Sequence, residues 1–249
     1  MVRHYIILSS SYSNGQRIAL DKSGINLNNI NIIHQMIDKI KKSCGEDTSL
    51  SMHCIEAESK EWESVKKEDS FFEDVLLLKD EDEFIQLIQK DRILSGLDVA
   101  KYILSKISCT QLKLQKLVYY CYADYLCSFH KRLFEDQIYA FELGPVVESV
   151  REKFKGSRDI DFENLDTKEI EKKSSLKMPI RSRILFADGG ISKLESIDQT
   201  IETYGEFTAK KLVDLTHQTG TPWESIYDGT SFKCISDDLI QEKHYLEVI

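Results

Sequence analysis

The stretch TQLKLQKLVYYCYADYLCSF, residues 110–129, decides the fold of this chain. Its first residue, Thr110, is of a type that caps the N-terminus of a helix. Apolar side chains then recur at helical spacing and cover far more than the ~100° stripe of a surface helix. They are Leu114, Leu117, Val118, Cys121, Tyr122, Tyr125, Leu126 and Phe129. The segment is therefore predicted to be the central helix of a bundle, buried on most sides.

Most of the chain around this segment also carries helical signals. Further helices are expected over 97–107, 146–154 and 191–204, after a cap at Thr208, and after Thr221. At the last of these, Thr221, Pro222 and Glu224 supply a cap residue, a proline for the first helical position and a capping-box carboxylate. A short extended segment is expected over 137–142, ended by Gly144–Pro145, because proline biases the residue before it away from helix.

Residues 1–94 alternate strand and helix signals instead. The expected elements are a strand over 3–8, a helix over 28–43, strands over 50–54 and 75–78, and a helix capped by Asp80. In the second strand Leu50, Met52 and Cys54 alternate with polar residues, so they are expected to face a core. The run at 75–78 is apolar throughout and fits a strand covered on both faces.

These patterns together predict an α+β protein that is mainly α. A small α/β N-terminal domain, residues 1–94, is expected to precede a helical bundle with a short β element, residues 96–249. With 249 residues and 41% hydrophobic residues, the chain can bury a core in each part.

Charge and hydropathy exclude several functions. No apolar run approaches the ~20 residues that cross a bilayer, so no membrane association is expected and the protein is predicted to be cytoplasmic. The net charge of −9 argues against direct DNA binding, which requires a basic face. Between Glu56 and Glu83, 12 acidic residues stand against 4 lysines. This run is either a solvated surface or an acidic face for a basic partner.

Few residues suggest chemistry. The six cysteines show no CxxC pair and are expected to be reduced and buried. Cys127 and His130 have ligand-like spacing but lack a second pair, so no metal and no cofactor are expected. His217, at the end of an expected helix, fits an interaction with the helix dipole or a last carbonyl better than catalysis.

No nucleotide-binding or hydrolase signature is present. The loop Ser9–Gly15 follows a strand, where backbone amides could meet a phosphate, but it lacks the glycines and the lysine of a phosphate-binding loop. The protein is therefore not expected to be an enzyme. A small enzyme or a nucleotide-binding activity in the N-terminal domain stays open as an alternative.

Four segments in order resemble a known family. They are Asp98–Leu104 followed by LKLQKLVYY at 112–120, AFELGPV at 140–146, LVDLTH at 212–217, and Pro222–Trp223. Together they span about residues 96–249 and resemble the Panacea domain, the SocA-like antitoxin family that was formerly a domain of unknown function.

The resemblance implies an antitoxin of a toxin–antitoxin system, which neutralises a cognate protein toxin by direct contact. The family's namesake also acts as a proteolytic adaptor that delivers its toxin to a Clp-type protease. Many of the toxins paired with the family act on RNA or on translation. A phage- or prophage-linked regulatory protein, which binds nucleic acid or a host protein, is the further alternative.

The family motifs also point to individual residues. Partner-binding positions implied by the resemblance are Lys113, Lys116, Tyr119, Tyr120, Phe141, Thr216, His217 and Trp223. Positions expected to hold the fold are Gln115, Gly144, Pro145, Thr221, Pro222 and Glu224. The motifs do not cover residues 1–94. We expect this extension, which contains the acidic run, to help recognise a partner with a basic, RNA-facing surface.

Overall fold

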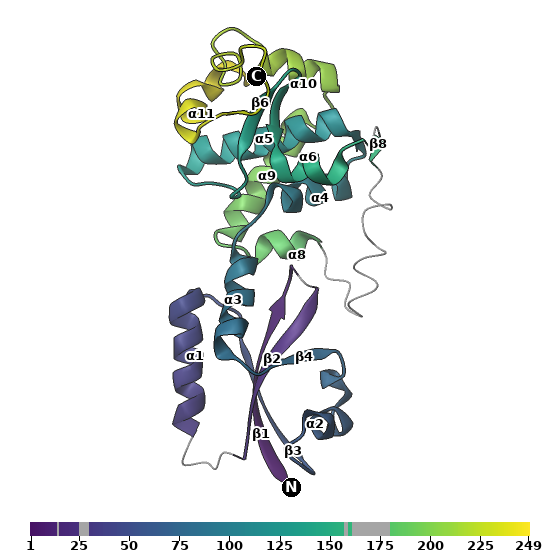
Figure 1. Cartoon of the computed structure of the whole chain (residues 1–249), viewed down its shortest axis with the longest axis vertical. Coiled ribbons are helices and arrows are strands. Elements are labelled where there is room, and N and C mark those ends of the chain that lie inside the picture. The colour runs from purple at the N-terminus through teal and green to yellow at the C-terminus, as the bar shows by residue number, and fades with distance from the viewer. Residues whose placement is uncertain (14, 25–29, 157–158, 161–179) are drawn as a thin grey trace. The chain divides into compact units, whose positions relative to one another are not determined.

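The computed structural model describes residues 1–13, 15–24, 30–156, 159–160 and 180–249. The chain folds into two compact units (Figure 1). The N-terminal unit is built on Met1–Arg92, and the C-terminal unit on the described residues from Ile93 to Ile249. As predicted, the fold is mainly α with an N-terminal α/β region. Within the described part of the chain, no helix has the length and apolar character needed to cross a membrane.

A four-stranded sheet of order β3-β1-β2-β4 forms the N-terminal unit. The central strand β1 (Val2–Ser11) pairs antiparallel with β2 (Gln16–Ser23) and with β3 (Ser51–Ala57). The edge strand β4 (Val75–Leu78) pairs parallel with β2. Alternating side chains of β1 therefore supply two cores, with Ile7 on one face and Ile6 on the other.

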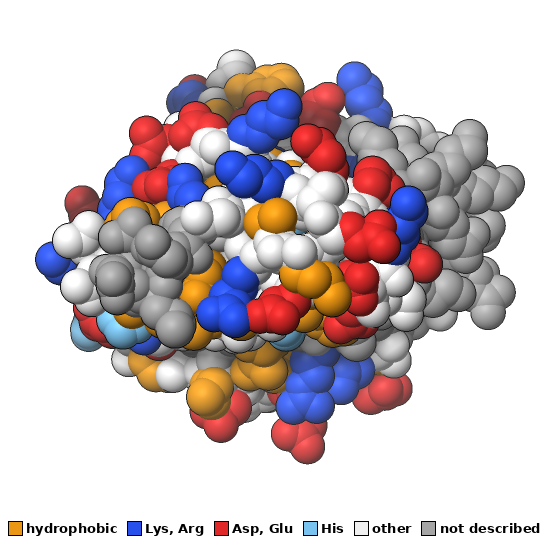
Figure 2. Space-filling model, turned by 90° about the horizontal axis from the view of Figure 1, so that it is seen from below, with side chains coloured by type: hydrophobic (Ala, Val, Ile, Leu, Met, Phe, Trp, Pro, Cys, Tyr) orange, Lys and Arg blue, Asp and Glu red, His pale blue; other side chains and the backbone are white. Residues whose placement is uncertain are grey.

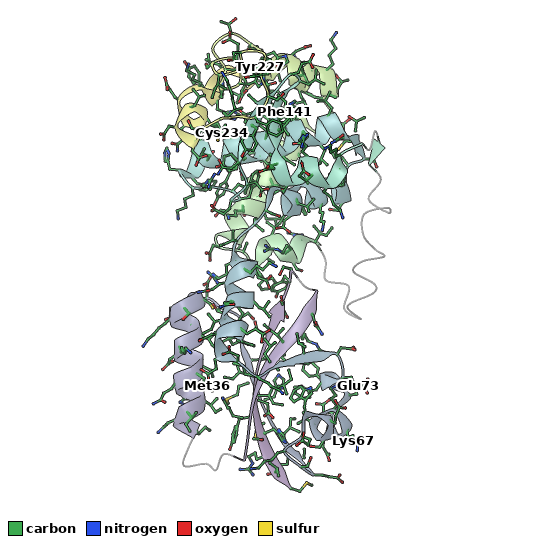
Figure 3. The ribbon with its side chains drawn as sticks, viewed as in Figure 1. Met36, Lys67, Glu73, Phe141, Tyr227 and Cys234 are labelled. Atoms are coloured by element: carbon green, nitrogen blue, oxygen red, sulfur yellow. The ribbon has the colours of Figure 1, made fainter. Side chains whose placement is uncertain are left out.

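Helices cover both faces of this sheet. α1 (Ile30–Cys44) and α3 (Glu81–Arg92) pack on the face of Ile7. α2 (Trp62–Glu68) and the 3₁₀ turn η2 (Ser70–Phe72) pack on the other face. In Figure 3, Met36 of α1 lies on one side of the sheet, and Lys67 and Glu73 lie on the opposite side.

Several N-terminal predictions are confirmed. The strands at 3–8, 50–54 and 75–78 exist, and the helix expected over 28–43 is described from Ile30. Asp80 caps α3 as expected, since its carboxylate accepts a hydrogen bond of 3.0 Å from the Asp82 amide. Cores lie on both faces of the sheet next to β4, with Val75 in one and Leu78 in the other, although Leu76 is exposed.

Two N-terminal predictions are wrong. On β3 the exposed residues include Met52 and Cys54, whereas Ile55 packs against the core. This reversal follows from His53, whose ring meets the rings of Phe71 and Phe72, each at 5.4 Å between centroids. The sequence also carried no signal for β2, and residues 9–11 of the loop expected over 9–15 belong to β1, whereas Tyr12, Ser13 and Gly15 lie in a turn.

The C-terminal unit is a helical bundle around α5 (Gln111–Phe129), the helix predicted to be central. Thr110 caps it by accepting a hydrogen bond from the Lys113 amide. Among the described residues the other helical segments are α4 (Gly96–Lys106), α6 (Glu148–Phe154), α8 (Ile180–Leu185), α9 (Gly190–Tyr204), α10 (Ala209–Thr216), α11 (Asp237–Lys243) and the 3₁₀ turn η4 (His244–Leu246). Most of the segment expected to be polar, 156–183, lies outside the described residues.

A small sheet accompanies the bundle, in the order β7-β6-β9. It consists of β6 (Ile138–Phe141), β7 (Gly144–Val147) and β9 (Lys233–Cys234). A second, two-stranded pair joins β5 (Cys109–Thr110) to β8 (Asp159–Ile160). The extended segment predicted over 137–142 is confirmed as β6. This segment ends before Gly144–Pro145 as expected, but these residues begin β7 and close a β-hairpin, so the helix expected over 146–154 begins only at Glu148.

The helix expected after Thr221 is only a turn. Its start signals do operate, since the Thr221 hydroxyl accepts a hydrogen bond from the Glu224 amide. However, the Glu224 carboxylate accepts from the Gly220 amide, not from the cap residue itself. The chain turns away at Asp228, whose carboxylate accepts from both the amide and the hydroxyl of Thr230.

The cysteines are free thiols and only some of them are buried. Cys44 and Cys121 are buried, Cys109 and Cys127 are half-buried, and Cys54 and Cys234 are exposed, which corrects the prediction for those two. Among the described residues no group of three or more His, Cys, Asp and Glu side chains could hold a metal ion. His130 bonds to Gln241 instead, through its Nδ1 atom at 3.2 Å.

Candidate functional site

The four family-like segments meet at the β6–β7 hairpin. Strand register places Phe141 opposite Gly144, so Glu142 and Leu143 form a two-residue turn at the tip. The hairpin packs against α5 and α10, and Figure 3 labels Phe141 on it. Because β7 is an edge strand, its outward backbone groups would be left without strand partners.

Side chains of α5 occupy this edge. The Gln115 amide, only 4% exposed, accepts a hydrogen bond of 2.9 Å from the Val147 N–H and donates one of 3.4 Å to the Val147 carbonyl. The side chain of Gln115 thus makes the two hydrogen bonds to Val147 that a neighbouring strand would make. Next to it, Lys116 donates from Nζ to the Pro145 carbonyl at 2.8 Å. Proline has no N–H, so these three bonds serve the edge of β7.

Lys116 is fully buried, which is rare for lysine. Burial lowers the pKa of its amine to about 7, and the nearby Glu247 carboxylate only partly opposes this. Close packing surrounds the amine. A Cβ on Gly144 would lie 2.7 Å from Lys116 Nζ and 2.8 Å from Thr216 Oγ1, and the backbone of Gly144 has a φ of +101°. Only glycine fits this position, because both the space and the dihedral angle exclude a side chain.

The segment around Trp223 holds the other strand of the hairpin. Its indole Nε1 donates to the Phe141 carbonyl at 2.8 Å. The imidazole of His217 lies on the indole with ring centroids 3.7 Å apart, and Tyr227 stacks on it at 4.8 Å. Burial, followed by the positive charge of Lys116, lowers the pKa of His217. The ring of His217 therefore supports Trp223, rather than meeting a helix carbonyl as the sequence suggested.

A second polar cluster lies further along α5. The buried Glu247 carboxylate accepts hydrogen bonds from the Tyr119 hydroxyl and from His244 Nδ1, the latter at 2.7 Å. His244 Nε2 meets Asp124 at 2.8 Å. Burial by itself would lower the pKa of His244, but its bonds to Asp124 and Glu247 outweigh burial and raise the pKa to about 9. This cluster fixes the C-terminal segment to the bundle.

The structure places the implied partner-binding residues at different depths. Lys116, Tyr119, Tyr120 and Thr216 are fully buried, and Trp223 is 8% exposed. Phe141, His217 and Lys113 are half-buried, and Lys113 donates to the Gly205 carbonyl. Of the residues expected to hold the fold, Gly144 and Pro145 belong to the hairpin and Gln115 bonds to its edge. Thr221, Pro222 and Glu224 lie in the turn that carries Trp223. A partner that docks on this conformation would touch Phe141 but not the buried tyrosines.

Exposed apolar residues that the sequence did not single out lie beside Phe141. Leu143, at the hairpin tip, is 52% exposed, and Phe232 is 57% exposed. The rings of Phe141 and Phe232 meet with centroids 4.8 Å apart. Between α5, the hairpin and α6 lies a pocket of about 360 Å³. The sequence around Phe232 does not indicate a binding residue, because its contacts with Phe141 and Arg151 form only when the loop before β9 folds against the hairpin.

The serine-rich turn of the N-terminal unit is already occupied. The backbone amides of Tyr12 and Ser13 donate to the two oxygens of the Asp91 carboxylate, at 2.6 and 2.9 Å. Asp91 is itself buried. These amides, which could have met a phosphate, bind a carboxylate of the chain's own α3.

The acidic run does not form one face. Its first part lies on β3 and around α2, and its last part, from Asp80 to Glu83, lies at α3 on the opposite side of the sheet. Cations accompany both parts, since Arg3 pairs with Glu56, and Lys39 pairs with Asp82 at 3.0 Å. Figure 2 accordingly shows blue and red side chains interspersed over the visible face.

These features define a helical domain whose buried polar side chains hold one short β-hairpin. The family model described as Antitoxin SocA-like, Panacea domain matches residues 114–224, from α5 to the turn at Trp223. A Panacea domain is thus found at residues 114–224, within the range that the motifs predicted, and this supports a role in a toxin–antitoxin system. No curated protein and no solved structure matches the chain.

Proposed function

We propose that this protein is an antitoxin that neutralises a cognate protein toxin by direct binding, through the tip of the β6–β7 hairpin and the surface around it. The observation that carries the proposal is the contrast between the base and the tip of the hairpin. Buried side chains hold its backbone at Pro145, Val147 and Phe141, whereas its tip exposes Leu143 to solvent.

Such a surface suits protein recognition for two reasons. Exposed leucine and phenylalanine side chains gain free energy when a partner covers them. A loop that is already fixed loses little conformational entropy on binding, which preserves that gain. The cost of burying Lys116 and Gln115 is then explained, because their contacts fix the hairpin in the conformation that the partner recognises.

The N-terminal unit adds a further part of this proposal. The acidic residues around α2 and those at α3 face different directions, so each group would meet a separate basic segment of the toxin. Replacing Glu58, Glu61 and Glu73 by glutamine tests the α2 side within the full chain. We expect slower association at low salt, measured by surface plasmon resonance, and no change if this side is only solvated.

The direct test is growth rescue. Each reading frame next to this gene is expressed with and without the antitoxin, and the toxic one is identified by the growth that the antitoxin restores. Substituting Leu143→Ser should abolish rescue, whereas Leu185→Ser, which alters an exposed leucine on α8, should preserve it. Absence of rescue with every neighbouring frame would contradict the proposal.

The same strain distinguishes the ways of neutralisation. If the antitoxin delivers the toxin to a Clp-type protease, the half-life of the toxin should fall on co-expression and recover when the protease is deleted. If it covers the toxin's active surface, the half-life stays constant and a stoichiometric complex is purified. An interface of standard size, about 1,600 Å², is sufficient for the second route.

A further inference from the structure

The pocket beside the hairpin combines apolar side chains with a few ionisable ones. Its lining residues are Gln111, Leu112, Gln115 and Lys116 of α5, Phe141, Glu142, Leu143 and Val146 of the hairpin, Arg151 of α6, and Ser231. Three of them are ionisable, namely Lys116, Arg151 and Glu142. Because burial lowers the pKa of Lys116 to about 7, Arg151 is the one of these groups that keeps a positive charge throughout the neutral range. The remaining lining is largely apolar.

Arg151 is the cation that an incoming group can reach. Its side chain is 25% exposed, and its Nη1 donates to the Glu152 carboxylate at 2.6 Å. The guanidinium carbon lies 5.2 Å from the centroid of the Phe141 ring and 5.4 Å from that of Phe232. Two aromatic rings therefore hold the guanidinium in place. The planar guanidinium has five N–H groups, whose arrangement matches a carboxylate.

Phe232 provides an independent sign that this place is functional. Its φ of +69° is in the left-handed region, which a bulky residue rarely adopts, and its amide donates to the Ala140 carbonyl at 3.2 Å. The ring that this conformation positions is more than half exposed. Strain of this kind persists where the surrounding structure enforces it, and it is concentrated at binding and active sites.

We propose that the pocket receives an apolar side chain of the partner protein, while an aspartate or glutamate next to it in the partner's sequence binds the Arg151 guanidinium. This rests on the proposed function, because it names the chemistry of the segment that the hairpin surface recognises. Leu112, Phe141 and Val146 contact the apolar side chain, and Phe232 covers the ion pair from the rim. Shielding from water strengthens that pair relative to an exposed one.

A peptide titration tests this without the toxin. The probes are acetylated and amidated Gly/Ser peptides that carry one leucine and one glutamate at spacings of one to four residues. Matched peptides carry glutamine in place of glutamate. Binding is followed by the fluorescence of Trp223, which bonds to the Phe141 carbonyl, in the full chain with Trp62→Phe so that only this indole reports.

We expect at least one spacing at which the glutamate peptide binds about tenfold more tightly than its glutamine partner. Arg151→Gln should abolish that difference, and Arg151→Lys should reduce it, because lysine lacks the planar fork. The control Lys210→Gln removes an exposed cation from α10 and should preserve the difference. Thermal unfolding of each variant shows that the fold is kept.

Three results would overturn the inference. They are equal binding of glutamate and glutamine peptides, a preference that survives Arg151→Gln, and no binding of any leucine peptide at about 1 mM. Displacement by inorganic phosphate of a signal that does not need leucine would identify an anion site instead. Growth rescue that persists while the titration fails would contradict this inference alone, whereas loss of both would also contradict the proposed function.

Discussion

The two units of this protein treat polar side chains differently. In the N-terminal unit several charges of α1, α3 and β3 pair at the surface. Its buried polar groups include His4, which bonds to Asp21 at 2.7 Å, and Asp91, which accepts from two backbone amides. In the C-terminal unit a lysine, a glutamine and a glutamate lie inside the bundle. The family match, residues 114–224, includes the lysine and the glutamine, Lys116 and Gln115, but not the glutamate, Glu247. The comparison teaches that Gln115, Lys116 and Trp223, three of the motif residues, hold the backbone of the hairpin in place.

The largest expected difference in stability is between alanine substitutions at two glycines with positive φ, Gly144 and Gly24. Gly144→Ala should destabilise the C-terminal unit by more than about 3 kcal/mol, because the new methyl group would overlap Lys116 Nζ and Thr216 Oγ1. In the N-terminal unit, Gly24→Ala meets only the flexible end of Lys60 and should cost about 1 kcal/mol. Urea denaturation of both variants measures the difference. Equal costs would show that the space beside Lys116 is not restrictive.

Two glutamines provide the next comparison. Gln115→Ala should cost about 2 kcal/mol, since it leaves the N–H and the carbonyl of Val147 without their partners inside the protein. Gln89→Ala removes an exposed bond of 2.8 Å to the Ser43 carbonyl and should cost less than about 0.5 kcal/mol. The same denaturation experiment applies. A small cost for Gln115→Ala would indicate that water replaces the amide at the edge of β7.

The pH dependence of stability sharpens the contrast, because two buried groups titrate in opposite senses. With a pKa lowered to about 7, Lys116 holds fewer protons in the native state than in the unfolded state up to its ordinary value of 10.5, so its contribution to stability rises with pH. With a pKa raised to about 9 from 6.5, His244 holds more protons in the native state, so its contribution falls as pH rises.

Between pH 7 and 9 these contributions oppose each other, so the free energy of unfolding of the wild-type protein should change little. In Lys116→Met only the contribution of His244 remains, so the free energy of unfolding should fall by on the order of 2 kcal/mol from pH 7 to pH 9. In His244→Gln only the contribution of Lys116 remains, so the free energy of unfolding should rise by a similar amount over the same range. Urea denaturation followed by Trp223, in a Trp62→Phe background, isolates the C-terminal unit. Identical slopes in both variants would refute the opposing titrations.

The smallest effect concerns two exposed phenylalanines, each beside an arginine. Phe71→Asn in the N-terminal unit loses the Arg17 guanidinium at 4.2 Å and should cost about 1 kcal/mol. Phe232→Asn also loses an arginine contact, but asparagine tolerates positive φ, so relief of strain should leave stability within about 0.5 kcal/mol of wild type. Thermal unfolding compares them. A cost for Phe232→Asn that matches Phe71→Asn would argue against strain at this residue.

Local sequence signals determined much of the fold. The cap at Thr110 and the apolar spacing after it identify α5, and the motifs from Leu112 to Trp223 identify the domain. The inward side of β3 could not be predicted, because it depends on aromatic residues that pack on His53 from η2. The hairpin was missed because Gly144–Pro145 is as typical of the end of a strand as of its beginning.

The candidate site was less predictable. A lysine on a helix normally suggests solvent, and Lys116 is buried only because the Pro145 carbonyl is brought to it by the hairpin. Nothing in the sequence next to Glu247 indicates that it is buried. Its cluster includes Tyr119 and Asp124 of α5, which precede the C-terminal segment by more than a hundred residues. Phe232 is recognised by its dihedral angle, which no pattern of residue types encodes.

The exposure of two thiols has a practical consequence. Cys54 lies on β3 and Cys234 on β9, so each unit carries one accessible cysteine, whereas burial raises the pKa of Cys44, Cys109, Cys121 and Cys127 and slows their modification. Nitroxide labels would therefore attach at one defined point in each unit without any engineered substitution. Double electron–electron resonance would then measure the distance between the two labels, and so any change in the separation of the two units when a toxin binds.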